Sequence, residues 1–192
     1  MNNSDQIVIG WNQSDGLYNQ IFCSQFDGTS WVHPTGLTDN ISPDGSGADG
    51  TQKVSISDSG KIIISWEQWV GINNQIFYSY FNGLSWNHPS SLSDYKLPSG
   101  ANSCVAALPM LSSSLSKILM ICSYEGKNRL YELDGANNFL APNATAYLSL
   151  PDESVFINSL KGFLVNDSLG VALYRSTYNS ETVSPIRYMK WE

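Results

Sequence analysis

Charged side chains are scarce in this sequence. Only 14% of its 192 residues are Asp, Glu, Lys or Arg, and the formal net charge is −7. Globular proteins average about a quarter charged residues, so neutral polar side chains must cover much of this surface. Ten Lys and Arg residues on an acidic chain do not provide a track that neutralises phosphates. The same charge balance disfavours an anionic membrane surface, and we expect neither nucleic acid nor membranes as partners.

Long hydrophobic runs are also missing. No stretch of the sequence reaches the roughly 18 consecutive apolar residues of a membrane-spanning helix. Met1 is followed by Asn-Asn-Ser-Asp, which has neither the basic start nor the apolar segment of a signal peptide. The chain is therefore expected either to be cytosolic or to have lost a leader or a larger parent. A secreted or cell-surface location is favoured if it is a fragment.

Cysteine and histidine are rare. The odd count and wide spacing of Cys23, Cys104 and Cys122 fit no metal motif, and free thiols within strands are favoured over a disulfide or a reactive thiol. The two histidines, His33 and His88, share one Trp-x-His-Pro context. A catalytic histidine would be needed at only one place in the protein. Two histidines at equivalent positions of a repeat therefore favour a packing or turn role. We expect no cofactor and no metal site.

The main feature of the sequence is an internal duplication. Residues 7–39 and 62–94 align without a gap at an offset of 55, and 18 of the 33 positions are identical. The shared positions include Ile7/Ile62, Ile9/Ile64, Trp11/Trp66, Gln13/Gln68, the run Asn-Gln-Ile-Phe, Gly28/Gly83, Ser-Trp, His-Pro, Leu37/Leu92 and Asp39/Asp94. A repeat of this length indicates a protein built from similar supersecondary units.

The second copy contains the signals of four short strands, here called A, B, C and D, whereas the first copy has no clear A strand before Ile7. In the second copy Lys53–Ser57 alternates apolar and polar residues, and Lys61–Gln68 is a largely apolar run that suits a strand buried on both faces. Gln75–Phe81 is rich in β-favouring residues. The Asn82-Gly83 turn, like Asp27-Gly28 before it, then leads to a short strand opened by tryptophan. This pattern predicts an all-β fold, a β-propeller of four-stranded antiparallel blades.

Two degenerate units follow the duplication. Their strands are expected at Cys104–Met110, Lys117–Cys122, Asn128–Leu133 and Phe139–Leu148, then at Leu164–Ser168 with its turn, Gly170–Tyr174 and Ile186–Trp191. We therefore expect one domain over residues 1–192, with blade units at about 6–40, 52–95, 103–148 and 154–192, or about three and a half blades. Closed propellers have at least four blades. The chain is expected to continue in a longer propeller or to self-associate through its open edges.

The repeat motifs resemble those of bacterial sialidase-like propellers and of propeller lectins. The resemblance rests on the motifs Ile-x-x-x-Trp-x-Gln, Asn-Gln-Ile-Phe, Phe-[Asp/Asn]-Gly-x-Ser-Trp and Leu-[Ser/Thr]-Asp, all within residues 7–95. The segment 56–63 is similar to the sialidase Asp-box, Ser-x-Asp-x-Gly-x-x-Trp. Asp58 and Gly60 fit, while Ile56 and Ile63 replace its Ser and Trp. The resemblance implies a propeller fold, and for an active sialidase it would imply three arginines, a Tyr–Glu pair and an Asp acid.

Candidate residues for chemistry are few. The three arginines, Arg129, Arg175 and Arg187, are expected on a C strand, after a B strand and on a C strand. No Tyr–Glu pair can be placed beside them, so solvated or paired arginines are favoured over catalysis. The loop Asp44–Gly50 offers oxygen ligands of the kind that calcium binds, without the EF-hand spacing. A solvated, flexible loop is favoured there.

Tryptophans offer a different surface. Trp11 and Trp66 on B strands, and Trp31 and Trp86 on D strands, are expected to pack between blades, with a sugar-stacking platform as the alternative. Trp69 has no counterpart, because Ser14 takes its place in the first copy. In propellers the B–C and D–A loops share the rim where ligands bind. The expected ligand-binding residues are Gln13, Asp15, Tyr18, Glu67, Gln68, Trp69, Asp39, Asn40, Asp94 and Tyr95.

Three functions are compatible with this pattern. The first is a non-catalytic module that binds a glycan or a protein through the rim, since amides and carboxylates beside exposed aromatics suit both ligands. The second is a fragment of a sialidase-like glycosidase whose active site is incomplete here. The third is a structural repeat module that assembles with itself. The absence of a placeable acid, base and nucleophile set favours the first and the third.

Overall fold

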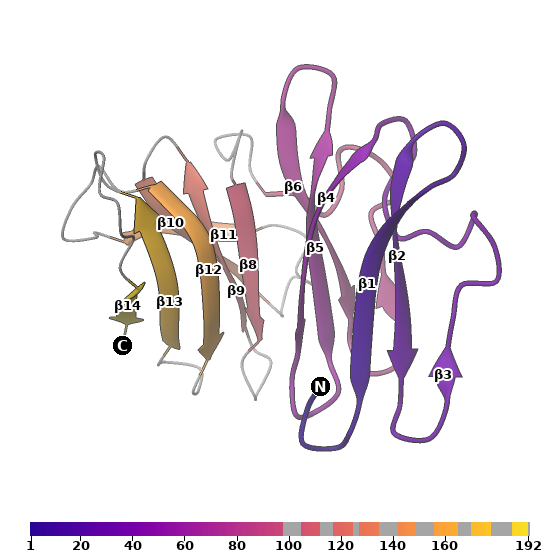
Figure 1. Cartoon of the computed structure of the whole chain (residues 1–192), viewed down its shortest axis with the longest axis horizontal. Coiled ribbons are helices and arrows are strands. Elements are labelled where there is room, and N and C mark those ends of the chain that lie inside the picture. The colour runs from indigo at the N-terminus through magenta and orange to yellow at the C-terminus, as the bar shows by residue number, and fades with distance from the viewer. Residues whose placement is uncertain are drawn as a thin grey trace.

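The structure is a computed structural model of the chain. It describes residues 1–97, 105–111, 117–124, 127–134, 142–148, 156–164, 170–177 and 186–191. These residues form an all-β fold of antiparallel strands (Figure 1). Among them there is no helix with the length and hydrophobicity needed to cross a lipid bilayer.

The strands form four sheets, and each strand pairs with the next one along the chain. Sheet 1 contains β1 (Ile7–Ser14), β2 (Asn19–Phe26) and β3 (Trp31–Val32). Sheet 2 contains β4 (Ala48–Ile56), β5 (Ile62–Trp69), β6 (Asn74–Phe81) and β7 (Trp86–Asn87). Sheet 3 contains β8 (Val105–Leu111), β9 (Lys117–Tyr124), β10 (Lys127–Asp134) and β11 (Pro142–Leu148). Sheet 4 contains β12 (Phe156–Leu164), β13 (Gly170–Thr177) and β14 (Ile186–Trp191).

This grouping matches the predicted strand order, with three strands in the first and last sheets and four in the others. Several boundaries were wrong. The first strand of sheet 2 begins at Ala48, whereas the sequence predicted it at Lys53–Ser57. Leu164 ends the first strand of sheet 4, which begins at Phe156, whereas the sequence reading started that strand at Leu164. Arg175 lies within β13 and not after it. None of these strands has a close copy in the chain that would align its ends.

The turns between strands C and D explain why the duplication keeps its glycines. Gly28 and Gly83 adopt φ angles of 102° and 98°, which residues with a side chain rarely adopt. In the first copy Asp27 Oδ1 accepts the N–H groups of Thr29 and Ser30. In the second copy Asn82 Oδ1 does the same for the two equivalent N–H groups. The predicted Asp-Gly and Asn-Gly turns are therefore confirmed.

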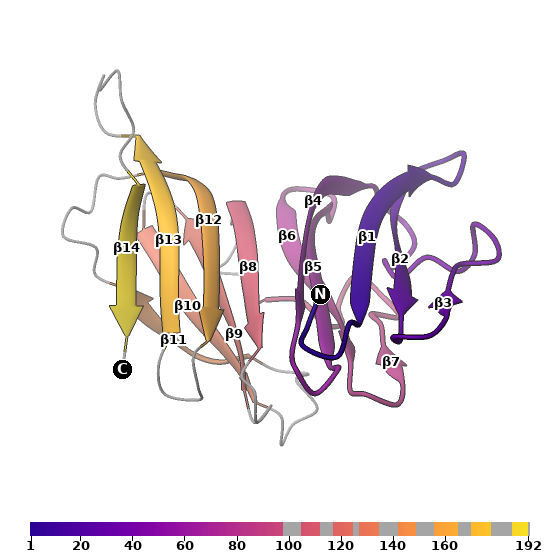
Figure 2. The same cartoon turned by 60° about the horizontal axis from the view of Figure 1, so that its bottom comes forward.

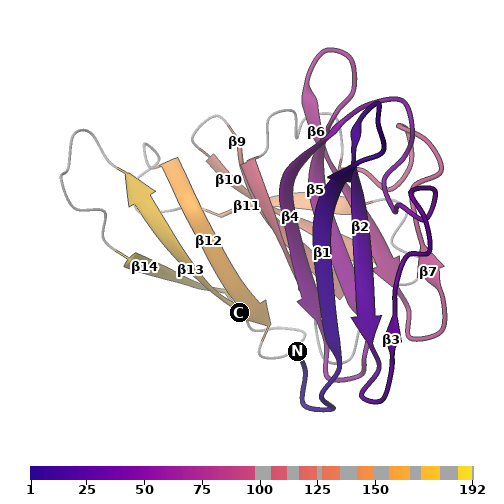
Figure 3. The ribbon, with the colours of Figure 1, turned by 45° about the vertical axis from the view of Figure 1, so that its right-hand side comes forward.

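The four sheets stand side by side in chain order (Figures 2 and 3). β4 contacts both β1 and β8, and β8 contacts β12, so the first strands of neighbouring sheets lie next to one another. Gly10 on β1 allows a close approach, because a Cβ there would lie 3.3 Å from Cγ2 of Val54 on β4. Gln52 on β4 also donates a hydrogen bond to the carbonyl of Gly10, at 3.1 Å.

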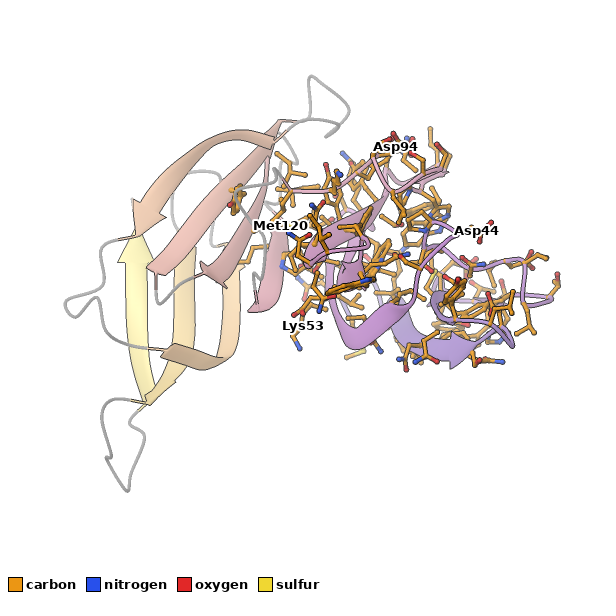
Figure 4. All side chains as sticks on the ribbon, turned by 90° about the horizontal axis from the view of Figure 1, so that it is seen from above. Asp44, Lys53, Asp94 and Met120 are labelled. Carbon is orange, nitrogen blue, oxygen red and sulfur yellow. The ribbon has the colours of Figure 1, made fainter. Side chains whose placement is uncertain are left out.

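Sheet 2 is buried on both faces. Toward sheet 1, Ile62, Ile64 and Trp66 pack in a cluster with Ile21. Toward sheet 3, Ile63 packs with Met120 and other residues of β9 and β10, and Figure 4 shows Met120 at the boundary between the two sheets. Because successive residues of a strand point to opposite faces, a strand buried on both faces needs a largely apolar sequence, which Ile62, Ile63, Ile64 and Trp66 provide. The prediction for this strand is confirmed.

Candidate functional site

The candidate site lies at one end of sheets 1 and 2. We call "the rim" the two turns 15–18 and 70–73 together with the linkers 39–47 and 94–97 that precede β4 and sheet 3. Backbone hydrogen bonds tie the linker 39–47 to the neighbouring strands: Trp69 N–H of β5 donates to Gly47 O at 3.3 Å, and Ile41 N–H donates to Ile21 O of β2 at 2.7 Å. The turns after β1 and β5 project at the same end of the molecule (Figure 1).

Exposed aromatic side chains mark this end. Trp69, the last residue of β5, is 47% exposed, and Tyr18, the last residue of the turn after β1, is 43% exposed. The tips of the turns also carry Leu17 and Ile72, which are 86% and 85% exposed. The sequence reading missed these two apolar residues, although the repeat offset places both at one position of two turns. Turns are usually polar, so an exposed apolar residue at the same position of both turns is unusual.

The rim carboxylates accept hydrogen bonds from their own turns. Asp15 Oδ1 accepts the N–H groups of Leu17 and Tyr18, both at 2.7 Å. Asp39 Oδ2 accepts both the N–H and the hydroxyl of Thr35. These hydrogen bonds lower the pKa of Asp15 and of Asp39 below the ordinary carboxyl value. Such groups stay ionised at neutral pH and shape their turns, so they are poor candidates for a general acid.

Asp94 and Tyr95 play the same kind of local role before sheet 3. Asp94 accepts a hydrogen bond from the hydroxyl of Ser90, which lowers the pKa of Asp94. Tyr95 adopts a positive φ of 44°. Its ring meets the buried ring of Tyr78 edge-on, with centroids 5.7 Å apart. Burial and the Asp94 charge raise the pKa of Tyr95.

Two expected rim residues are buried. Gln68 is 0% exposed and Glu67 is 9% exposed. Gln68 Nε2 donates to Pro43 O and Ser46 Oγ, and its Oε1 accepts the indole N–H of Trp66. The expectation that Gln68 forms part of an accessible surface is therefore wrong, and Glu67 offers little surface. The sequence could not show this, because the linker that covers Gln68 lies more than twenty residues away.

The linker itself also differs from the prediction. The loop Asp44–Gly50 was expected to be solvated and flexible, yet Ser46 and Ala48 are buried. From Ala48 onward the chain belongs to β4. The linker is held because its carbonyl and hydroxyl oxygens satisfy the buried amide of Gln68. Across the described part of the chain, no three His, Cys, Asp or Glu side chains are grouped to hold a metal ion.

The remaining expected residues stay accessible in part. Gln13 is exposed, and its Oε1 accepts the indole N–H of Trp11 at 3.2 Å. Asn40 is half-buried, donates to Leu37 O and accepts the hydroxyl of Ser42. Trp69 and Tyr18 are thus the two expected residues with a large exposed side chain at this end. The structure reduces the candidate surface to these aromatics, the turn tips and polar groups of the linkers.

The histidines have the predicted packing role. His33 Nδ1 lies 2.8 Å from Ser24 Oγ, and His88 Nδ1 lies 3.0 Å from Ser79 Oγ. Their rings stack on Trp31 and Trp86, with centroids 5.5 and 5.4 Å apart. Each histidine therefore ties strand C to the segment after strand D. Cys23 is a free thiol as predicted, with its pKa raised to about 11 by burial; Cys104 lies outside the described residues, and Cys122 lies on β9.

His88 gives the fold a testable pH dependence. Desolvation of the ring lowers the pKa of His88 from 6.5 to about 4, although the residue as a whole is exposed to solvent. Below pH 6.5 the unfolded chain then binds more protons than the folded one. The free energy of unfolding is expected to fall as the pH is lowered from about 6.5 to about 4, and then to level off for this group.

Urea unfolding of the wild type and of His88→Gln at pH 4.5 and pH 7 measures this effect. The variant should lose less stability between the two pH values than the wild type does. The aspartates whose pKa values are lowered from 3.8, such as Asp15 and Asp27, titrate below this window. An equal loss in both proteins would show that His88 is not the group responsible.

Comparison with known proteins supports the fold class. No protein-family model matches this sequence, and a search of curated proteins finds no match. Among solved structures, the polysaccharide lyase Uly1 is similar to 97% of this chain, with a TM-score of 0.52 and 11% identity. A glycosyl hydrolase from Bacteroides ovatus is similar to 99% of the chain, with a TM-score of 0.51 and 13% identity. This chain spans 43% and 63% of those two proteins, so it corresponds to only part of each.

Proposed function

We propose that this chain is a non-catalytic module that binds a glycan at the rim, and that its four sheets are consecutive blades of a β-propeller. The observation that carries the proposal is Trp69, a tryptophan that the repeat does not require and that is 47% exposed at the end of β5. Flat aromatic faces pair well with the apolar faces of sugar rings when polar groups stand nearby. The two structural relatives named above are enzymes of polysaccharides and glycosides, which favours a glycan over a protein ligand.

The charge of the rim narrows the class of glycan. Asp15, Asp39 and Asp94 accept hydrogen bonds that keep them ionised, and the whole chain has a net charge of −7. A polyanionic glycan would be repelled by this surface. We therefore expect neutral polysaccharides to bind, and we expect their binding to change little between low and high salt.

The lowered pKa values of the rim carboxylates support binding without cleavage at the rim. Hydrolysis of a glycoside usually needs two carboxyl groups on either side of the bond, one of them with a raised pKa. Asp15, Asp39 and Asp94 instead have lowered pKa values and serve their own turns. A sialidase-like activity remains the competing proposal, and incubation with polysaccharides followed by analysis of new reducing ends separates the two.

Trp69→Ala should lower the affinity for a bound neutral polysaccharide at least tenfold. The side chain would supply the stacking surface, while its exposure means that its removal leaves the core intact. Affinity electrophoresis in gels that contain the polysaccharide measures the change. The matched control is Leu84→Ala, since Leu84 is 93% exposed on the turn between β6 and β7 and should leave the affinity unchanged. Equal retardation of the wild type and Trp69→Ala would refute the assignment of the ligand to this rim.

A further inference from the structure

One face of the repeat occurs twice in this chain, and the two copies differ in what covers them. In sheet 2 the face carries Ile62, Ile64 and Trp66 of β5 and Phe77 of β6, which are all at most 1% exposed. By the offset of 55, the equivalent residues in sheet 1 are Ile7, Ile9, Trp11 and Phe22. We call these four residues, with Gln13, the open face.

In sheet 2, residues of sheet 1 and of the linker before β4 pack over this face. Ile21, Val8 and Cys23 of sheet 1 pack against it. The linker adds Ile41, whose carbonyl accepts the Ser79 hydroxyl at 3.3 Å, and the oxygens of Pro43 and Ser46 that bind Gln68. The cover is therefore the opposite face of a neighbouring repeat sheet together with its linker.

Within the described residues the open face is only partly covered. Phe22 is 2% exposed, and Ile7 and Trp11 are half-buried, but Ile9 and Gln13 remain open to solvent. Ile9 is 49% exposed, whereas its counterpart Ile64 is 0% exposed. Gln13 is exposed, whereas Gln68 is fully buried. Both copies have the same hydrogen bond within this face: the indole N–H of Trp11 donates to Gln13, and that of Trp66 donates to Gln68. Sheet 1 thus carries the same kind of surface that sheet 2 uses in its interface with sheet 1.

The other half of that interface has counterparts at the far end of the chain, in sheet 4 (Figure 2). The residues that sheet 2 uses to cover sheet 3 include Ile63, Ile76 and Tyr78. Leu164 pairs with Gly170 as Ile56 pairs with Ile62, and the strands that follow keep the same register. The positions equivalent to Ile63, Ile76 and Tyr78 are therefore Val171, Ile186 and Tyr188.

We propose that the open face binds sheet 4 of a second copy of this chain, head to tail. Each interface between copies would repeat the contact already made between sheets 1 and 2 and between sheets 2 and 3. A head-to-tail contact of this kind closes into a ring when its rotation permits, and two copies use it twice. The inference rests on the repeated face and not on the rim, so it stands independently of glycan binding.

Light scattering coupled to size exclusion tests this proposal with the intact chain. The wild type should have at least twice the 21.2 kDa mass of one chain. Ile9→Glu should give the mass of one chain, because a charge would be buried in the interface without a partner. Leu17→Glu is the matched control, since Leu17 is exposed on the adjacent turn and outside the open face. It should keep the mass of the wild type.

A mixing experiment tests the direction of the contact. Tyr188→Glu should also be a single chain, and a mixture of the Ile9→Glu and Tyr188→Glu proteins should restore one interface and give a mass of two chains. Circular dichroism of each variant verifies that it is folded. A wild type with the mass of one chain over the accessible concentrations would overturn the proposal. So would an assembly that survives Ile9→Glu, or a mixture of folded variants that stays at the mass of one chain.

Discussion

Trp66→Ala should destabilise the folded chain by about 3–5 kcal/mol, the usual cost of truncating a buried tryptophan. Trp66 is 1% exposed and lies in the core cluster between sheets 1 and 2. Its ring stacks on Phe77 with centroids 6.3 Å apart, and its N–H donates to Gln68 Oε1 at 2.9 Å. The truncation therefore leaves a cavity and an unpaired amide oxygen. Urea denaturation followed by circular dichroism measures the change.

Trp69→Ala is the control for that variant. It removes the same side chain from the same strand, three residues further on, where the ring is 47% exposed. Its cost should stay below about 1 kcal/mol, as for substitutions away from the core. If Trp66→Ala were no more destabilising than Trp69→Ala, sheets 1 and 2 would not pack through this cluster.

Gln68→Leu should cost about 3–5 kcal/mol, although it replaces a polar side chain by an apolar one of similar size. Gln68 is fully buried and bonds to Trp66, Pro43 and Ser46. Leucine would leave an indole N–H and linker oxygens buried without partners, and each such group costs about 1–3 kcal/mol. The loss should also loosen the linker before β4, and hydrogen exchange at Trp69, whose N–H bonds to Gly47 O, measures that loosening.

Gln13→Leu provides the repeat-matched control. Gln13 is the counterpart of Gln68 at the offset of 55, but it is exposed and bonds to Trp11 alone among the described contacts. In dilute protein, where the open face is uncovered, its replacement should change the free energy of unfolding by less than about 0.5 kcal/mol. Equal costs for the two variants would mean that burial by the linker does not distinguish the copies.

The strands could be predicted from the sequence because the duplication shows them twice. The apolar run of β5 and the glycine turns are local signals that both copies share, whereas the alternating residues of β4 lie before the duplicated segment and occur once. The strand ends in sheet 4 were less certain because no near-identical copy fixes them. The close approach of β4 to β1 at Gly10 could not be inferred, since it depends on packing between residues far apart in sequence.

The candidate site was predicted less well than the strands. Gln68 was placed on the rim because it lies next to the loop between strands B and C. In a strand successive side chains point to opposite faces, and a linker whose contacts are not visible in the sequence covers Gln68. Asp15 and Asp39 were expected to serve a ligand because carboxylates often do. Their hydrogen bonds to nearby N–H groups follow a turn pattern that the sequence does carry, since aspartate often bonds to the backbone two residues on.

The most direct test of the proposed function is a glycan array and polysaccharide panel, read for both binding and cleavage. We predict that the purified chain is retained by one or more neutral polysaccharides, that retention persists in high salt, and that no new reducing ends or other cleavage products appear. Release of such products would contradict a purely binding role. Failure to retain any glycan would contradict the assignment of the rim.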